Sequence, residues 1–225
     1  MCCAASLAHD THCEITINQG MLKGSLSRSK KDFCAYTGIP YGEPPLGNLR
    51  FRAPRPLKSW EGVLDATKEG NICWQPASFD KYLGDEDCLF INVYTPNLKS
   101  SVERILPVMF WIPPGEFYTE NNYRSSYEPD LFVDKDILLV TFNYRVGAFG
   151  FLSTQDDEAP GNYGMKDQIL ALHWVRDNIK AFGGDPSRVT IAGISSGAAS
   201  VHFLLLSPLA KDIMDSTIPR LYSCC

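Results

Sequence analysis

Runs of apolar residues alternate with polar stretches along the chain and predict a series of strands. Four runs are almost uninterrupted, which is typical of strands buried on both faces of a sheet. They cover residues 89–94, 107–112, 137–142 and 188–192. Near the start, polar and apolar residues alternate, which predicts half-buried strands over 13–18, 22–26 and 33–37. A stretch rich in Pro and Gly over 39–56 is expected to cross the surface.

Two helices are predicted between and after the later strands. Six apolar residues recur at spacings of three and four and form one apolar face; they are Met165, Ile169, Leu172, Val175, Ile179 and Phe182. This helix should end at Gly183-Gly184, and a second helix is expected over 196–206, before Pro208. Strands that alternate with helices favour the α/β class, here a mostly parallel sheet with a small antiparallel N-terminal lead-in.

Composition narrows the function classes. The chain has 225 residues, enough for one large core, with 44% hydrophobic and 21% charged residues. A net charge of −5 argues against a nucleic-acid partner. No apolar stretch approaches the length of a membrane span. The eight cysteines show no metal-binding spacing, so we expect no metal or cofactor. The start lacks a basic signal-peptide region and the chain has no Asn-x-Ser/Thr site, which indicates a cytoplasmic location, or secretion if the true N-terminus differs.

The sequence Gly193-Ile194-Ser195-Ser196-Gly197 lies where a predicted strand turns into a predicted helix. A G-x-S-x-G sequence at such a turn exposes the serine hydroxyl, because the flanking glycines tolerate a strained backbone. Ser195 is therefore the candidate nucleophile. The alternative is a serine that only caps an ordinary helix.

Several further motifs occur in a fixed order along the chain. They are Gly38-Ile39-Pro40-Tyr41-Gly42-Glu43-Pro44-Pro45, Arg50-Phe51-Arg52-Ala53-Pro54, Glu86-Asp87-Cys88-Leu89-Phe90-Ile91-Asn92-Val93-Tyr94, and the stretches 143–152 and 161–197. Together with the serine motif, they resemble the type-B carboxylesterase family, the branch of the α/β-hydrolases that includes cholinesterases and insect esterases. The resemblance spans residues 14–211 and leaves 1–13 as a leader and 212–225 as a divergent tail. It implies an α/β-hydrolase fold, present here as an incomplete N-terminal portion. It also implies a small carboxylic ester as substrate, which is hydrolysed through an acyl-enzyme.

The resemblance also assigns residues. It makes Ser195 the nucleophile and places the oxyanion-hole donors at Gly115, Glu116 and the backbone N–H of Ser196. It implies a disulfide between Cys73 and Cys88, or buried thiols if the compartment is reducing. Arg50 and Glu86 correspond to a buried ion pair with a structural role.

The sequence departs from the family pattern around this site. The oxyanion turn reads Pro113-Pro114-Gly115-Glu116-Phe117; Pro114 has no N–H, and Glu116 adds a carboxylate where negative charge opposes a developing oxyanion. Ile194 replaces the acidic residue that usually precedes the serine.

The chain also lacks an obvious catalytic base. The triad order is Ser, then Asp/Glu, then His. His9 and His12 belong to the leader, His173 precedes the nucleophile, and His202 lies two helical turns beyond it. We therefore expect this chain to be truncated before the triad acid and base and inactive by itself. The alternative is a non-catalytic protein that binds a ligand or a protein partner.

Choline esters are not the expected substrates. The aromatic residues between the two cysteines are Trp74, Phe79 and Tyr82. None of them occupies the position expected for a choline-binding tryptophan.

Overall fold

The computed structural model describes residues 13–78, 80–98 and 105–214. The predicted leader before residue 13, Phe79 and the predicted tail beyond residue 214 lie outside the described residues.

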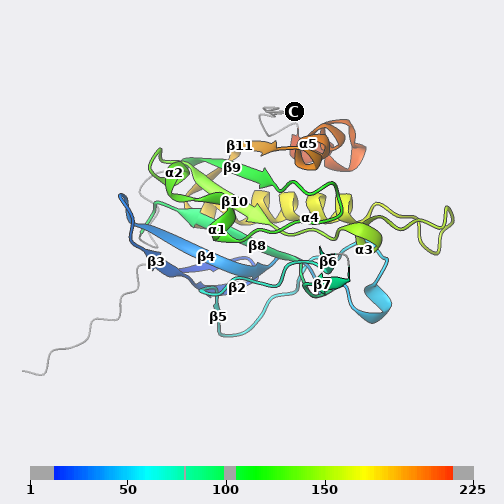
Figure 1. Cartoon of the computed structure of the whole chain (residues 1–225). Helices are drawn as coiled ribbons and strands as arrows, with labels where there is room; N and C mark the ends of the chain where they lie inside the picture. Colours follow the sequence, from blue (N-terminus) through cyan, green and yellow to red (C-terminus); the bar gives the residue numbers. More distant parts are fainter. Residues whose placement is uncertain (1–12, 79, 99–104, 215–225) are drawn as a thin grey trace, which may run out of the picture.

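A six-stranded sheet forms the centre of the molecule (Figure 1). Its spatial order is β11-β9-β10-β8-β4-β3. The strands are β3 (Ser25–Ser27), β4 (Phe33–Pro40), β8 (Phe90–Thr95), β9 (Leu106–Ile112), β10 (Leu138–Phe142) and β11 (Gly184–Gly193). β11, β9 and β10 are parallel to one another, whereas β8, β4 and β3 continue the sheet through antiparallel pairings. The antiparallel part is larger than the lead-in that the sequence indicated.

Two smaller sheets flank this one. β1 (Glu14–Ile17), β2 (Gly20–Lys23) and β5 (Val63–Asp65) form one of them, and β6 (Gln75–Ser78) pairs with β7 (Lys81–Leu83) in the other. The segment predicted as one strand over 22–26 divides at Gly24 between two sheets. A Cβ at Gly24 would lie 2.6 Å from the Tyr36 ring and 2.7 Å from the carbonyl oxygen of Ala35, so only glycine allows this close passage.

The two predicted helices are present. α4 (Tyr163–Asn178) continues into the 3-10 turn η2 (Ile179–Phe182), which Gly183 ends with a left-handed backbone (φ 84°). α5 (Ser196–Leu206) follows β11 directly. The remaining helices are short: η1 (Gly47–Leu49), α1 (Arg124–Tyr127), α2 (Asp130–Val133), α3 (Gly147–Phe151), η3 (Pro208–Ala210) and α6 (Lys211–Met214).

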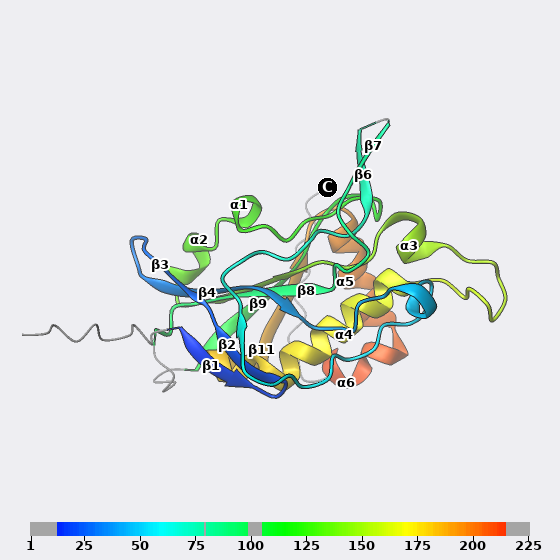
Figure 2. The same cartoon turned by 90° about the horizontal axis from the view of Figure 1, so that it is seen from below.

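Helices cover both faces of the large sheet (Figure 2). α4 and α6 lie on one face, over the main core, which includes Val108, Phe110 and Leu172. α1 and α2 lie on the other face, over a smaller cluster that includes Phe33 and Tyr94. Because alternate residues of each strand point to opposite faces, burial on both faces explains why the strand sequences are almost continuously apolar.

Candidate active site

Ser195 lies at a strained turn between β11 and α5. Its backbone has φ 55° and ψ −124°, a conformation that L-residues rarely adopt. A Cβ at Gly193 would lie 2.6 Å from the carbonyl carbon of Gly197, and one at Gly197 would lie 2.2 Å from the carbonyl oxygen of Ile112. Both glycines are therefore required by close backbone contacts, one across the turn and one between α5 and β9.

The Ser195 side chain is exposed and makes no capping hydrogen bond to the helix. This observation argues against the alternative that Ser195 serves only as a helix cap. Ser195 is therefore open to the surroundings of the protein.

The residues after β9 reach the same edge of the sheet as this turn. Ile112 is paired with Gly193, so the parallel strands β9 and β11 end side by side. Beyond β9 the chain forms a tight turn in which the Gly115 carbonyl accepts the N–H groups of Tyr118 (2.8 Å) and Thr119 (2.9 Å). Gly115 has φ 133°, and a Cβ there would lie only 1.9 Å from the Thr119 carbonyl oxygen.

Three backbone N–H groups near Ser195 are available to a ligand. They belong to Gly115, Glu116 and Ser196, and none of them donates a hydrogen bond to another described residue. Ser196 is the first residue of α5, where helix geometry leaves the N–H unpaired. Glu116 adopts a left-handed backbone (φ 59°) and its side chain is exposed. The arrangement offers donors of the kind that stabilise an oxyanion.

A buried hydroxyl lies next to these donors. Ser196 is 6% exposed, and its hydroxyl oxygen makes no hydrogen bond of good geometry to a described residue, although the Tyr144 hydroxyl lies nearby. Tyr144 donates a long hydrogen bond (3.5 Å) to the Pro113 carbonyl. Burial raises the pKa of Tyr144, the Glu120 charge adds to this effect, and the nearby Ser196 hydroxyl opposes it.

The histidines do not supply an evident base. His202 is exposed on α5, about 10 Å along the helix from Ser195 at 1.5 Å per residue. His173 is half-buried on α4. His9 and His12 lie outside the described residues.

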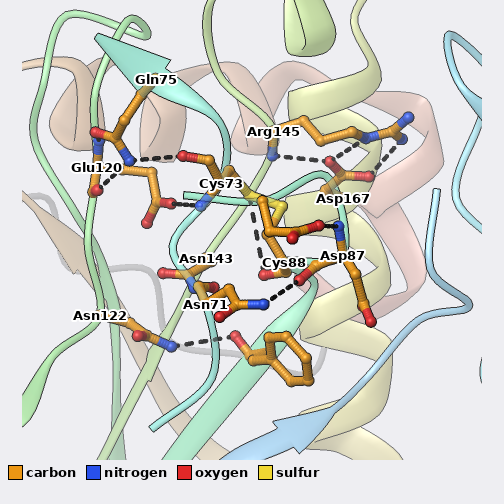
Figure 3. The surroundings of a disulfide bond; sticks show 12 residues. Asn71, Cys73, Gln75, Asp87, Cys88, Glu120, Asn122, Asn143, Arg145 and Asp167 are labelled. Carbon is orange, nitrogen blue, oxygen red and sulfur yellow. Dashed lines mark hydrogen bonds and ion pairs between the residues drawn. A yellow bond between two sulfur atoms is a disulfide. The ribbon is translucent and has the colours of Figure 1, made fainter. Parts of the chain in front are cut away.

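Two disulfides are present among the described residues. Cys73–Cys88 is present and closes the loop that contains β6 and β7 (Figure 3). The second, Cys13–Cys34, was missed, because eight scattered cysteines allow many pairings and the sequence favours none of them.

The predicted ion pair between Arg50 and Glu86 is present, but it is not buried. Arg50 and Glu86 do form two hydrogen bonds (2.5 and 2.6 Å), but their side chains are 43% and 21% exposed. The buried pair is Arg145–Asp167, with exposures of 3% and 0% and contacts of 2.7 and 2.8 Å (Figure 3). Arg50 lies in the stretch over 39–56 that crosses the surface and is exposed to water. Arg145 is instead covered by α4, which also carries its partner Asp167.

An apolar cavity of about 650 Å³ lies beside the oxyanion turn. Phe117 extends from that turn and packs edge-on against Phe151, with ring centres 5.3 Å apart. The cavity is lined by Phe117, Phe151, Asn162, Met165, Lys166, Ile169, Phe203, Ser207 and Leu209. Met165 and Ile169, predicted as part of the core face of α4, are therefore only half-buried.

Within residues 13–78, 80–98 and 105–214, no group of His, Cys, Asp or Glu side chains could hold a metal ion. No helix in this part of the chain is both long and apolar enough to cross a membrane.

The parallel strands of a mixed sheet, the glycine-flanked strained serine and the free amides at the same sheet edge resemble the nucleophile turn of α/β-hydrolases. The carboxylesterase family matches residues 11–220, so the chain belongs to that family.

Curated relatives agree with this assignment. A carboxylic ester hydrolase of Bombus ignitus is 46% identical over 201 residues, and the juvenile hormone esterase of Tribolium castaneum is 43% identical over 215 residues. The para-nitrobenzyl esterase of Bacillus subtilis is 41% identical over 217 residues. These matches cover 86%, 93% and 92% of this chain, but only 35%, 36% and 43% of the relatives. The chain thus spans less than half the length of the curated relatives it matches.

Proposed function

We propose that this chain forms the nucleophile-bearing part of a carboxylic ester hydrolase. Ser195 attacks the ester carbonyl, the alcohol leaves, and water releases the acid from the acyl-enzyme. The N–H groups of Gly115, Glu116 and Ser196 stabilise the oxyanion. The observation that supports this proposal best is the strained backbone of exposed Ser195 beside three unpaired amides.

The proposal requires a base and an acid from residues outside this sequence. His202 is too far along α5 to receive the Ser195 proton, and no other histidine follows the nucleophile. The 225 residues alone should therefore not turn over aryl esters. A longer reading frame that adds a downstream acid and histidine should produce an active enzyme.

Two forms of the protein, the 225-residue chain and the longest reading frame, test this function. The transcript is sequenced past the codon for Cys225, the longest frame is expressed, and hydrolysis of p-nitrophenyl acetate and butyrate is measured. Turnover by the long form that disappears in Ser195→Ala supports the proposal, with His202→Ala as the control that should retain activity. Turnover by the 225-residue chain that depends on Ser195 would contradict the need for a separate base.

A second candidate function is non-catalytic ligand binding, which the exposed carboxylate of Glu116 at an oxyanion position favours. A negative charge there opposes the stabilisation of an oxyanion. Ester binding that persists unchanged in Ser195→Ala, in a long form without turnover, would support this alternative.

A further inference from the structure

Glu120 is a buried acid that the proposed reaction does not use. It lies at the end of the oxyanion segment (residues 113–120) and is 4% exposed. One carboxyl oxygen, Oε1, accepts the N–H of Cys73 at 3.1 Å, so the side chain reaches the loop closed by Cys73–Cys88 (Figure 3). The other oxygen, Oε2, is buried and has no hydrogen-bond partner among the described residues.

Gln75 adds hydrogen bonds between the same two segments, the oxyanion segment and the disulfide-closed loop. The backbone N–H of Glu120 donates to Gln75 Oε1 (2.8 Å), and Gln75 Nε2 donates to the Glu120 carbonyl (2.8 Å). Gln75 Nε2 also donates to the carbonyl of Cys73 (2.9 Å). Residue 120 is thereby attached to the disulfide-closed loop by three hydrogen bonds, two from its backbone and one from its side chain.

Glu120 forms no ion pair with any residue that the structure describes. The titratable groups that face it are tyrosines: Tyr41 after β4, Tyr123 before α1, Tyr127 in α1 and Tyr144 after β10. The buried Arg145 is already paired with Asp167. A carboxylate in this position would be a buried anion without a counter-charge, which is strongly unfavourable.

Burial accordingly raises the pKa of Glu120 well above its usual range, and the hydrogen bond from Cys73 only partly offsets this effect. A neutral carboxylic acid fits the contacts, because Oε1 accepts a hydrogen bond while the proton resides on the unpartnered Oε2.

We propose that Glu120, as a neutral acid, is a positioning residue that holds the oxyanion segment on the disulfide-closed loop. When Glu120 ionises, the buried anion draws in water and segment 113–120 separates from Cys73. The effect on catalysis rests on the proposed function, because it requires Gly115 and Glu116 to be oxyanion donors. The attachment itself does not.

The expected pH dependence follows from the raised pKa. In the unfolded chain Glu120 titrates near 4.5, whereas in the folded chain it keeps its proton to higher pH. Its contribution to stability is therefore complete below about pH 4.5 and is lost as pH rises towards the folded pKa. In that interval the folding equilibrium constant falls by up to about tenfold per pH unit.

The test compares the longest reading frame with its Glu120→Gln variant by urea unfolding between pH 5 and 8 without reductant. Glutamine keeps an acceptor oxygen for the Cys73 N–H and cannot ionise, so the variant should lose the pH-dependent decrease. Burial and Asp85 also raise the pKa of Asp87, but Asp87 contributes equally to both proteins and cancels in the comparison. Glu61→Gln, on an exposed side chain, is the matched control and should follow the unsubstituted chain. Parallel pH profiles for the chain and Glu120→Gln would overturn the proposal.

Hydrogen exchange of the unsubstituted chain gives a second readout that does not require the variant to fold. After correction for intrinsic rates, protection of the Tyr118, Thr119 and Glu120 amides should fall with rising pH by a larger factor than protection in β9, which reports on global unfolding. Protection that changes by the same factor in both segments, or in neither, would overturn the proposal. Neither measurement depends on ester turnover, so either can succeed or fail independently of the proposed function.

Discussion

The two arginine–carboxylate pairs show how strongly the role of a residue depends on what covers it. Arg50–Glu86 and Arg145–Asp167 both have two-point geometry. The first is partly exposed to water, which screens the charges and limits the stabilisation. The second is enclosed, so each charge depends on its partner.

Removal of one partner should therefore have very different effects at the two sites. Asp167→Asn leaves the buried Arg145 without a counter-charge and should lower the free energy of unfolding by about 3–5 kcal/mol. Glu86→Gln, the matched change in the exposed pair, should lower it by about 1 kcal/mol or less. Urea unfolding at pH 7 measures both, and equal losses would show that the Arg145 site admits water.

At the residue scale, the sequence predicted the position of Ser195 but not the burial around it. A short motif defines the serine turn locally, because its glycines and serine are adjacent in the chain. Burial of Asp167 and Glu120 depends on segments that are distant in sequence, and no local pattern records those contacts. The roles of Ser195, Gly115, Glu116 and Ser196 stay predictions until the kinetic test is made.

At the element scale, α5 and β9 pack so closely that only a glycine fits where they touch. Gly197 lies in the first turn of α5, with the Ile112 carbonyl oxygen 2.2 Å from the position that a Cβ would take. Alanine normally stabilises a helix relative to glycine by about 1 kcal/mol. Here the same methyl group would push α5 away from β9.

Gly197→Ala should therefore destabilise the chain by about 1–3 kcal/mol, as overpacked positions do, and should displace Ser195. His202→Ala, at an exposed position of the same helix, should change stability by no more than about 0.5 kcal/mol. Thermal unfolding followed by circular dichroism measures both. A stabilised Gly197→Ala variant would show that helix propensity outweighs the contact.

The sequence predicted the buried strands and both long helices, while their exact ends differ. β11 begins at Gly184, before the predicted residue 188, and its pairing with β9 shifts register between Gly184 and Val189. Hydrophobicity does not mark this extension because the added residues are polar. Strand order also could not be predicted, since it depends on pairings such as β4 with β8 across more than fifty residues.

At the scale of the whole molecule, one side of the described structure is apolar and uncovered. Among the described strands, β11 pairs only with β9, so its other edge is open. Phe203, Leu206 and Leu209 are 50%, 71% and 66% exposed near the apolar cavity. Open edges and apolar patches of this kind promote association.

The 225-residue chain expressed alone should therefore self-associate and bind a hydrophobic dye. Replacement of Leu206 and Leu209 with Lys should reduce dye binding and leave the far-ultraviolet circular dichroism unchanged. Light scattering and dye fluorescence measure the two effects. A monomer with a sharp, cooperative thermal transition and no dye binding would contradict this expectation.

The Cys13–Cys34 bond has a consequence for synthesis on the ribosome. Its two cysteines are only 21 residues apart in the sequence. The sheet partner of β4, strand β8, begins more than fifty residues after Cys34 and is therefore synthesised later. At about 5–20 residues per second, β8 emerges roughly 3–12 s after Cys34. Disulfide formation takes seconds or longer, so an oxidising compartment with a fast catalyst could close this bond on the nascent chain. β1 and β4 would then be joined before the central sheet exists.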